Sequence, residues 1–352
     1  MRAVVYAGEG AVRVDEVPRP TLQDPRDAIV KVSRSSICGS DLHLLNGKTP
    51  GMREGGIIGH EFVGNVFEFG EGVRNLHQDG RVLGSFLIAC GRCSQCALER
   101  FNHCKDRRAL GLGPLTGDLD GAQAEYVRVP NADMNLKPLT GVFSALSDEQ
   151  ALFGGDILTT GFYAAALSQI KKDQTVVVVG AGPVGMFSFV AAMSARPGKV
   201  LLLDTDPKRV DFLGSAAGID VLLIEDEAQA GNAVAERTNG EMADVVIDAV
   251  GSVAAFKTAL RCVREGGRVT VVGVYGTERY DLPLGKVWLR GIDIRFAGMA
   301  NIHRHWEDAL LSVAKGGFDP TALITHRMPL EEAEKGYELF AARDAMKVVL
   351  TH

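Results

Sequence analysis

A run of valines that leads into a glycine-rich turn constrains the fold of this chain more than any other segment. Residues 176–185 read Val-Val-Val-Val-Gly-Ala-Gly-Pro-Val-Gly, and residues 186–194 follow with a helical pattern. In a strand–turn–helix unit with the spacing G-x-G-x-x-G, the first glycine makes the tight turn, the second admits a pyrophosphate against the backbone, and the third packs helix on strand. The helix N-terminus then faces the phosphates with its partial positive charge. The segment predicts a dinucleotide-binding unit with cofactor contacts at Gly180, Gly182, Pro183, Val184 and Gly185.

An acid at the end of the next apolar run bears on the choice of dinucleotide. Asp204 closes the run that starts at Val200, nineteen residues after Gly185. A carboxylate at this place can accept both hydroxyls of the adenosine ribose and repels the 2′-phosphate of NADP, so the sequence favours NAD as cofactor. Arg209 keeps NADP open as the alternative, because a nearby arginine can hold that phosphate.

The pattern of apolar runs in the sequence changes near residue 150. Before it, short runs rich in Val, Ile and aromatic residues lie between glycines and prolines, which is the pattern of an all-β domain. From about residue 174 to 295, short apolar runs alternate with helical segments, as in a parallel sheet covered by helices. The expected strands are 28–33, 62–67 and 125–129 in the first part, 176–179, 200–203, 245–247 and 269–272 in the second, and 346–350 near the end.

Charge and hydropathy exclude two classes of partner. The formal net charge is −6 and basic residues do not cluster, so we expect no nucleic-acid binding. No apolar stretch is long enough to span a membrane, and the N-terminus lacks the apolar core of a signal peptide. We therefore expect a cytoplasmic protein with no membrane partner.

Four of the six cysteines fall within fifteen residues, with the spacing C-x2-C-x2-C-x7-C. In a reducing compartment such a cluster favours metal binding over disulfides or free thiols. Four thiolates suit a tetrahedral zinc ion and leave no open position, so this zinc would be structural. Cys262 stands apart and reads as a small buried hydrophobe. The predicted structural-zinc ligands are Cys90, Cys93, Cys96 and Cys104.

A second, open metal site is predicted from residues that lie far apart in the sequence. Cys38 and His60 are twenty-two residues apart, and Asp156 follows two glycines much later. One thiolate, one imidazole and one carboxylate, with a fourth position left for water or substrate, form the pattern of a catalytic zinc.

Taken together, these motifs resemble the zinc-dependent alcohol dehydrogenases of the medium-chain dehydrogenase/reductase superfamily, over nearly the whole chain. The resemblance implies an α/β protein with a GroES-like β-barrel catalytic domain and a Rossmann doubly wound parallel sheet. We expect the catalytic domain at 1–153, with its zinc lobe at about 90–104, the Rossmann domain at 154–296, and a segment at 297–352 that returns to the first domain. It implies reversible hydride transfer between a primary or secondary alcohol and the nicotinamide, with an aldehyde or ketone in reverse.

Residue roles are carried over by matching positions. Cys38, His60 and Asp156 match the catalytic zinc ligands, and Glu61 matches an acid that can approach that zinc. With the four-cysteine lobe, this makes two zinc ions per subunit. Ser40 matches the hydroxyl that contacts the substrate alcohol, and His43 matches the outer member of a proton relay.

Other matches concern the nucleotide. Arg209 matches a basic residue beside the adenosine ribose, and Thr160 a position beside the nicotinamide. Val250, Gly273 and Val274 lie at strand ends that line the cofactor cleft in this family.

Several alternatives remain open at this stage. Residues 155–162 are similar to secondary-alcohol and formaldehyde dehydrogenases, and polyol or threonine-type dehydrogenases share the same machinery. A non-catalytic zinc-binding protein on this fold is a remote alternative, as is a zinc-ribbon nucleic-acid binder. Ser40 could simply cap the turn after Cys38, and His43 could be a surface residue. Family members are tetramers or dimers; we expect a homo-oligomer, a tetramer before a dimer, with a pairing strand near 275–284.

Overall fold

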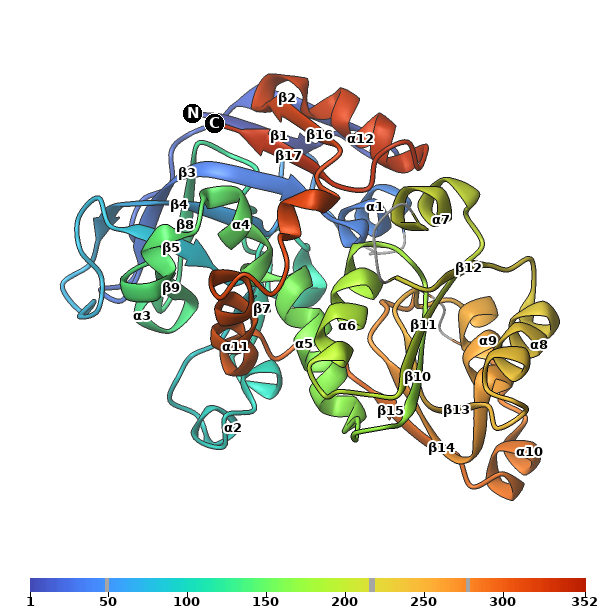
Figure 1. Ribbon diagram of the computed structural model, residues 1–352. Helices are drawn as coiled ribbons and strands as arrows, with labels where there is room; N and C mark the ends of the chain where they lie inside the picture. The colour runs from blue at the N-terminus through green and yellow to red at the C-terminus, as the bar shows by residue number, and fades with distance from the viewer. Residues whose placement is uncertain (48–50, 215–218, 277–278) are drawn as a thin grey trace. The chain divides into compact units, whose positions relative to one another are not determined.

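A computed structural model describes residues 1–47, 51–214, 219–276 and 279–352 of the chain (Figure 1). The chain divides into two compact units, Met1–Thr159 with Asn301–His352, and Thr160–Ala300. Each unit is built on a sheet of its own. Within the described residues, no helix has the length and apolar character needed to cross a membrane.

The sheet of the second unit has six strands, all parallel, in the order β12-β11-β10-β13-β14-β15. Its central strands are runs of Val, Leu and Ile that are buried on both faces, as a sheet covered by helices requires. Strand order reverses between β10 and β13, and ligands of such sheets bind at the carboxyl ends of the strands beside that point. This confirms the predicted Rossmann-type class. The strands are β10 (Thr175–Val179), β11 (Lys199–Asp204), β12 (Val221–Leu223), β13 (Ala243–Asp248), β14 (Val263–Val271) and β15 (Asp293–Phe296).

Helices cover both faces of this sheet (Figure 1). The helix after the glycine-rich turn, α6, packs against β10 and β11, whereas α9 packs against β13 and β14. α6 begins three residues before the predicted start, because Gly182 is its N-cap and Pro183 fits the first turn, where a missing N–H costs nothing. The helices are α5 (Ile157–Ser168), α6 (Pro183–Met193), α7 (Pro207–Gly214), α8 (Glu227–Arg237), α9 (Val253–Cys262) and α10 (Leu284–Leu289).

The first unit has a seven-stranded sheet in the order β16-β17-β3-β4-β5-β9, with β8 also paired to β3. The C-terminal strand β17 pairs antiparallel with β3, with Val348 opposite Ile37, so the last residues of the chain lie beside residues 34–37 (Figure 1). The strands are β1 (Arg2–Tyr6), β2 (Val12–Glu16), β3 (Ala28–Ile37), β4 (Glu61–Phe69), β5 (Arg81–Gly84), β6 (Leu87–Ile88), β7 (Arg108–Ala109), β8 (Tyr126–Val129), β9 (Leu136–Pro138), β16 (His326–Pro329) and β17 (Val348–Thr351).

Short helices join these strands and carry several of the polar residues discussed below. The apolar core between them includes Phe62 and Val82, both almost fully buried. The α-helices are α1 (Gly39–Leu45), α2 (Ser94–Ala97), α3 (Ala132–Asn135), α4 (Asp148–Leu152), α11 (Ile302–Ala314) and α12 (Ala333–Ala341), and the 3-10 turns are η1 (Phe101–His103), η2 (Pro114–Thr116), η3 (Gly141–Ala145), η4 (Phe153–Gly155), η5 (Pro320–Leu323) and η6 (Leu330–Glu332).

The expected pairing strand near 275–284 is wrong for the part that the structure describes. Residues 277–278 lie outside the described residues, and the described neighbours form no strand before α10 begins at Leu284. The segment Asp281-Leu-Pro283 leads directly into α10, whose N-cap is Pro283. The edge strand on this side of the sheet is β15.

Candidate functional site

A buried cluster of four metal-ligating side chains lies in the first unit. Cys38 precedes α1, His60 and Glu61 stand at the start of β4, and Asp156 precedes α5. Their ligand atoms all lie within 4.8 Å of one another. Asp156 Oδ2 lies 3.4 Å from Cys38 Sγ and 3.3 Å from His60 Nε2. The structure therefore brings the three predicted ligands together and adds Glu61 to them.

Asp41, which was not predicted as a site residue, contacts two members of this cluster. Its Oδ2 accepts a hydrogen bond from the backbone N–H of Cys38 at 2.9 Å, which caps α1. Its Oδ1 lies 3.1 Å from His60 Nδ1. Burial opposes the charged imidazole, but the charge of Asp41 and the contact with Asp156 outweigh it and raise the pKa of His60 well above its ordinary value. A carboxylate beside Nδ1 favours the tautomer with its proton on Nδ1, which would leave Nε2 for the cluster, the usual arrangement of a metal-binding histidine.

A buried lysine stands behind Glu61. Lys347 Nζ donates a hydrogen bond to Glu61 Oε2, as does the hydroxyl of Ser36. The side chains of Lys347 and Glu61 are 1% and 0% exposed. Burial raises the pKa of Glu61 to about 7, although the nearby Lys347 charge works in the opposite direction. Lys347 was not predicted from the sequence, although a single lysine within the apolar run 346–350 was an available signal.

The donor set fits a zinc ion. Burial raises the pKa of the Cys38 thiol, and the neighbouring Asp156 and Glu61 charges add to the effect, because three acidic groups crowd one dry site. Glu61 Oε1 is buried without a hydrogen-bond partner among the described residues. A dication would offset this crowding. One sulfur, one imidazole nitrogen and one carboxylate leave the fourth position of a tetrahedral ion open.

Two further predicted residues lie on α1, beside this cluster. Ser40 Oγ lies 3.2 Å from His60 Nε2, so its hydroxyl faces the same point as the metal ligands. His43 is half-buried and follows Ser40 by three residues, which places both on one side of the helix. The N-cap of α1 is Cys38 rather than Ser40. The alternative that Ser40 merely caps this turn is therefore not what the structure describes.

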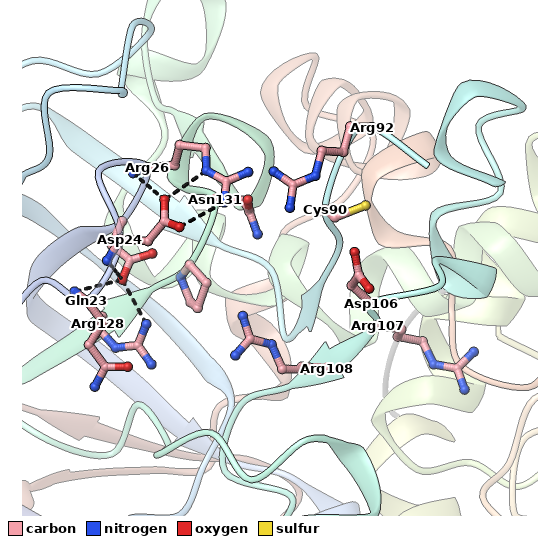
Figure 2. Close-up of a pocket in the computed structure, with 12 residues that line it drawn as sticks. Gln23, Asp24, Arg26, Cys90, Arg92, Asp106, Arg107, Arg108, Arg128 and Asn131 are labelled. Carbon is pink, nitrogen blue, oxygen red and sulfur yellow. Dashed lines mark hydrogen bonds and ion pairs between the residues drawn. The ribbon is translucent and has the colours of Figure 1, made fainter. Parts of the chain in front are cut away.

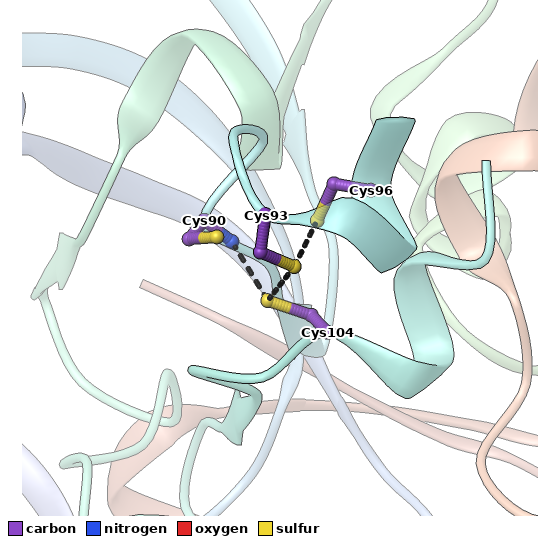
Figure 3. A group of neighbouring side chains, drawn as sticks. All are labelled: Cys90, Cys93, Cys96 and Cys104. Carbon is purple, nitrogen blue, oxygen red and sulfur yellow. Dashed lines mark hydrogen bonds between the residues drawn. The ribbon is translucent and has the colours of Figure 1, made fainter. Parts of the chain in front are cut away.

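The four predicted structural-zinc ligands also converge (Figure 3). Cys93 Sγ lies 3.6 Å from Cys96 Sγ and 3.9 Å from Cys104 Sγ. Four sulfurs at about 2.3 Å from one tetrahedral zinc ion would be about 3.8 Å apart, so the spacing fits the ion. All six cysteines are free thiols. Backbone N–H groups of Lys105 and Cys96 lower the pKa of Cys93 to about 6, which favours the thiolate that a metal needs.

The glycine-rich turn lies in the second unit and has the geometry expected of it. Gly180 has φ +99°, a conformation that favours glycine, at the end of β10. A Cβ at Gly185 would lie 1.7 Å from the carbonyl oxygen of Gly180, so only glycine lets α6 approach β10 this closely. Gly182, Pro183 and Val184 form the N-terminus of α6.

Asp204 is bound to this turn. Its Oδ2 accepts a hydrogen bond from the backbone N–H of Ala181 at 2.6 Å, and its Oδ1 accepts one from Asp206 N at 2.8 Å. Arg209 Nη1 lies 3.6 Å from Asp204 Oδ2. The carboxylate and the guanidinium therefore stand next to each other beside the glycine-rich turn.

The other predicted cofactor residues occupy different places in the second unit. Val250 is 46% exposed and lies against Gly180, since a Cβ added at Gly180 would come within 2.5 Å of Val250 Cγ2. Gly273 abuts the backbone of Gly251, and Val274 is 55% exposed. Thr160 is buried in α5, one turn after Asp156.

Comparison with known proteins identifies the relatives of this chain. Residues 24–138 match the alcohol dehydrogenase GroES-like domain, and residues 183–315 match the zinc-binding dehydrogenase family. A Bacillus subtilis protein described as an uncharacterized zinc-type alcohol dehydrogenase-like protein is 35% identical, over 99% of this chain and 100% of that protein. Zinc-type alcohol dehydrogenase B of Aspergillus flavus is 33% identical, over 99% of this chain and 81% of the relative.

Solved structures agree with these relatives. Alcohol dehydrogenase TADH from Thermus sp. ATN1 is 40% identical with a TM-score of 0.93, and covers 100% of this chain and 99% of its own. Zinc dependent alcohol dehydrogenase 2 from Streptococcus is 32% identical with a TM-score of 0.88, over 100% and 98% of the two chains. With its two candidate zinc sites and its parallel nucleotide-binding-type sheet, the chain belongs to the zinc-dependent alcohol dehydrogenases of the medium-chain dehydrogenase/reductase superfamily.

Proposed function

We propose that the protein oxidises a primary or secondary alcohol with NAD and reduces the corresponding aldehyde or ketone in reverse. The observation that carries this proposal is the buried convergence of Cys38, His60 and Asp156, with the Ser40 hydroxyl 3.2 Å from His60 Nε2. The first unit would carry the catalytic site, and the second unit would bind the dinucleotide. The two compact units end near the boundaries expected from the sequence, which supports this division.

Each residue of the cluster has a distinct part in this proposal. Cys38, His60 and Asp156 hold the catalytic zinc, and Asp41 orients His60 through its Nδ1 atom. A bound zinc ion supplies a Lewis acid that makes a substrate hydroxyl acidic near neutral pH. Ser40 accepts a hydrogen bond from the substrate hydroxyl and, as it takes up that proton, releases its own toward His43, which passes a proton on to solvent. Glu61 is paired with Lys347 and would lie next to the bound metal.

Zinc in the four-cysteine lobe has a different purpose. With four protein ligands the ion has no open position, so it would hold residues 90–104 in shape rather than take part in the reaction. Together the two sites bind two zinc ions per subunit.

For the dinucleotide we propose NAD, with Asp204 as the selecting residue. The bond from Ala181 N holds the Asp204 carboxylate beside the glycine turn, where it accepts the ribose hydroxyls and repels a 2′-phosphate. Gly180, Gly182, Pro183, Val184 and Gly185 would bind the pyrophosphate, and Thr160, Val250, Gly273 and Val274 would line the nicotinamide side. NADP is the alternative, since Arg209 lies beside Asp204 and a 28% identical dehydrogenase from Sinorhizobium meliloti was solved bound to NADP.

Absorbance at 340 nm tests both parts of this proposal. Zinc-loaded protein is mixed with NAD or NADP and with primary, secondary, aromatic and polyol alcohols, threonine and formaldehyde. We expect reduction of NAD by one class of simple alcohol. Reduction of NADP alone would refute the role of Asp204. Turnover confined to threonine would favour the alternative suggested by a 29% identical L-threonine 3-dehydrogenase of Bacillus licheniformis.

A variant of the relay residue separates its role from folding. His43→Ala should slow turnover most at low pH, where loss of a proton to solvent is least favourable, while the protein stays folded. An unchanged pH profile would remove His43 from the proton path.

We also propose that the protein is a cytoplasmic homo-oligomer, a tetramer before a dimer. The support is a set of exposed apolar side chains on the second unit: Trp288 and Leu289 of α10 are 81% and 79% exposed, and Phe296 of the edge strand β15 is 67% exposed. Large exposed apolar side chains beside an unpaired strand edge favour association. Light scattering of the purified protein tests this, and a monomeric mass would contradict it.

A further inference from the structure

A pocket lined by five arginines lies in the first unit, beside the four-cysteine lobe (Figure 2). Its volume is about 540 Å³, within the range of roughly 300–1,000 Å³ that is usual for small-molecule sites. No residue of the Cys38 cluster lines it. The arginines are Arg26, Arg92, Arg107, Arg108 and Arg128.

Two of the arginines are already neutralised. Arg26 binds Asp24 through two hydrogen bonds of 2.8 and 2.9 Å, and Arg128 Nη1 donates to the buried Asp27 at 2.8 Å. These pairs form one wall of the pocket and hold its shape. Asp106 is the third acid that lines the pocket, so five arginines against three aspartates leave a net charge of +2.

The excess charge resides on arginines that have no acidic partner. Among the described residues, neither Arg92 nor Arg108 forms an ion pair or a side-chain hydrogen bond, and Arg107 donates only to the carbonyl of Asn102. In Figure 2 the guanidinium groups of Arg92 and Arg108 point toward the space around Asn131, whereas that of Arg107 points away. Arg92 and Arg108 therefore offer their donors to the same space from two sides.

The side chain of Arg108 packs over a glycine. A Cβ at Gly117, which has φ +95°, would lie 2.3 Å from Arg108 Cγ and 2.8 Å from its Cδ. The stem of Arg108 thus lies directly over Gly117, and its backbone is fixed in β7, where it pairs with Ile88. An arginine that is positioned before a ligand arrives loses less entropy on binding.

We propose that this arginine pocket binds a phosphorylated small molecule through Arg92 and Arg108. A phosphate monoester carries a charge of about −1.5 to −2 near neutral pH, which matches the net charge of the pocket. Guanidinium groups bind phosphate oxygens with paired, charge-assisted hydrogen bonds. The volume exceeds that of a lone phosphate, so room remains for the group that the phosphate is attached to. This site lies outside the proposed alcohol and dinucleotide sites.

The four-cysteine lobe offers a competing use for the same charge. A zinc ion with four thiolates carries a formal charge of −2, and Cys90 lines the pocket. Among the arginines, Arg26 is the one whose pKa is raised in part by the charge of Cys90, and its guanidinium is already bound to Asp24. Arg92 and Arg108 would then only stabilise the zinc site, and zinc content distinguishes this use from ligand binding.

Isothermal titration calorimetry with inorganic phosphate, at constant ionic strength, tests the proposal on the full-length zinc-loaded protein. The double variant Arg92→Gln/Arg108→Gln removes both free guanidinium groups. A control, Arg13→Gln/Arg53→Gln, removes the same charge from exposed positions elsewhere in the unit. Gly117→Ala keeps every charge and displaces Arg108. Each titration is repeated with saturating NADH, because the glycine-rich turn is itself a phosphate site, and zinc is measured in every variant.

We expect one phosphate per chain that NADH does not displace, binding weakened tenfold or more in the double variant and severalfold in Gly117→Ala, and no change in the control. Zinc content should be the same in all four proteins. The proposal is overturned if wild-type protein binds no phosphate, if NADH displaces it, or if the double variant binds like the control. A double variant that loses zinc but keeps its phosphate affinity would show that the arginines serve the metal lobe instead.

Discussion

The pair of Lys347 and Glu61 gives the sharpest prediction about what holds the metal-ligand cluster. Its side chains are 1% and 0% exposed, so neither charge has water as an alternative partner. Lys347→Met preserves most of the apolar stem and removes the cation, which leaves Glu61 facing Asp156 in a dry site. Removing one member of a buried pair costs about 3–5 kcal/mol, whereas an exposed pair contributes about 0–1 kcal/mol. We therefore expect Lys347→Met to lower the free energy of unfolding of the first unit by about 3 kcal/mol or more.

The chain offers a control and a built-in probe. Lys137, whose side chain is 21% exposed, pairs with Glu307, which is 60% exposed, so Lys137→Met removes the same charge from a pair that water reaches. Of the two tryptophans, Trp306 is 8% exposed in the first unit and Trp288 is 81% exposed in the second, so Trp288→Phe leaves fluorescence to report the first unit. Urea unfolding of both lysine variants in that background gives the two free energies.

A double variant completes the cycle. In Glu61→Gln/Lys347→Met both charges are gone, so most of the lost stability should return, because the cost arises from the charge left unpaired. The reasoning is refuted if Lys347→Met costs no more than Lys137→Met. It is also refuted if the double variant is as unstable as the sum of its single changes.

Three further predictions concern the metal sites and the nucleotide turn. Zinc affinity at the Cys38 cluster should rise between about pH 6 and about pH 8, because zinc competes with protons for these groups. Burial raises the pKa of Glu61 to about 7 and also raises that of the Cys38 thiol. Chelator competition at the two pH values measures the affinity, and equal affinities would contradict the prediction. Cys93→Ser should lose one zinc ion per chain and lower the melting temperature; full zinc content would argue against the four-cysteine site. Gly185→Ala should weaken NADH binding about tenfold or more in a fluorescence titration, because its Cβ would meet the Gly180 carbonyl oxygen at 1.7 Å and force α6 away from β10. Unchanged affinity would mean that NADH binding does not depend on this close approach of α6 to β10.

Local patterns were sufficient to predict the fold class. The valine run at 176–179 and the glycine spacing after it determine a strand, a turn and a helix from neighbouring residues alone, and the structure has all three. Helix α6 starts earlier than its apolar pattern suggests, because Pro183 and the N-cap Gly182 set its beginning rather than hydrophobic periodicity. The pairing strand expected near 275–284 is wrong, because the described part of this segment leads into the short helix α10 and β15 forms the edge of the sheet.

Residues that act through tertiary contacts were harder to find. Asp41 lies between the predicted residues Ser40 and His43 in sequence, but its contact with His60 depends on how α1 faces β4. Lys347 and Glu61 are 286 residues apart in sequence, and they meet only because β17, which follows Lys347, returns to pair with β3. The arginine pocket is assembled from separate segments around residues 24–27, 90–92, 106–108 and 128–131, and no linear motif predicts it.

Zinc content and turnover of Cys38→Ser, compared with wild-type protein, test the central claim most directly. We predict two zinc ions per chain in the wild type and one in the variant, which should remain folded and lose alcohol-dependent reduction of NAD. The ion that remains should be the one held by the four-cysteine lobe. Wild-type turnover in Cys38→Ser, with its zinc content unchanged, would contradict the assignment of Cys38, His60 and Asp156 as the catalytic metal site.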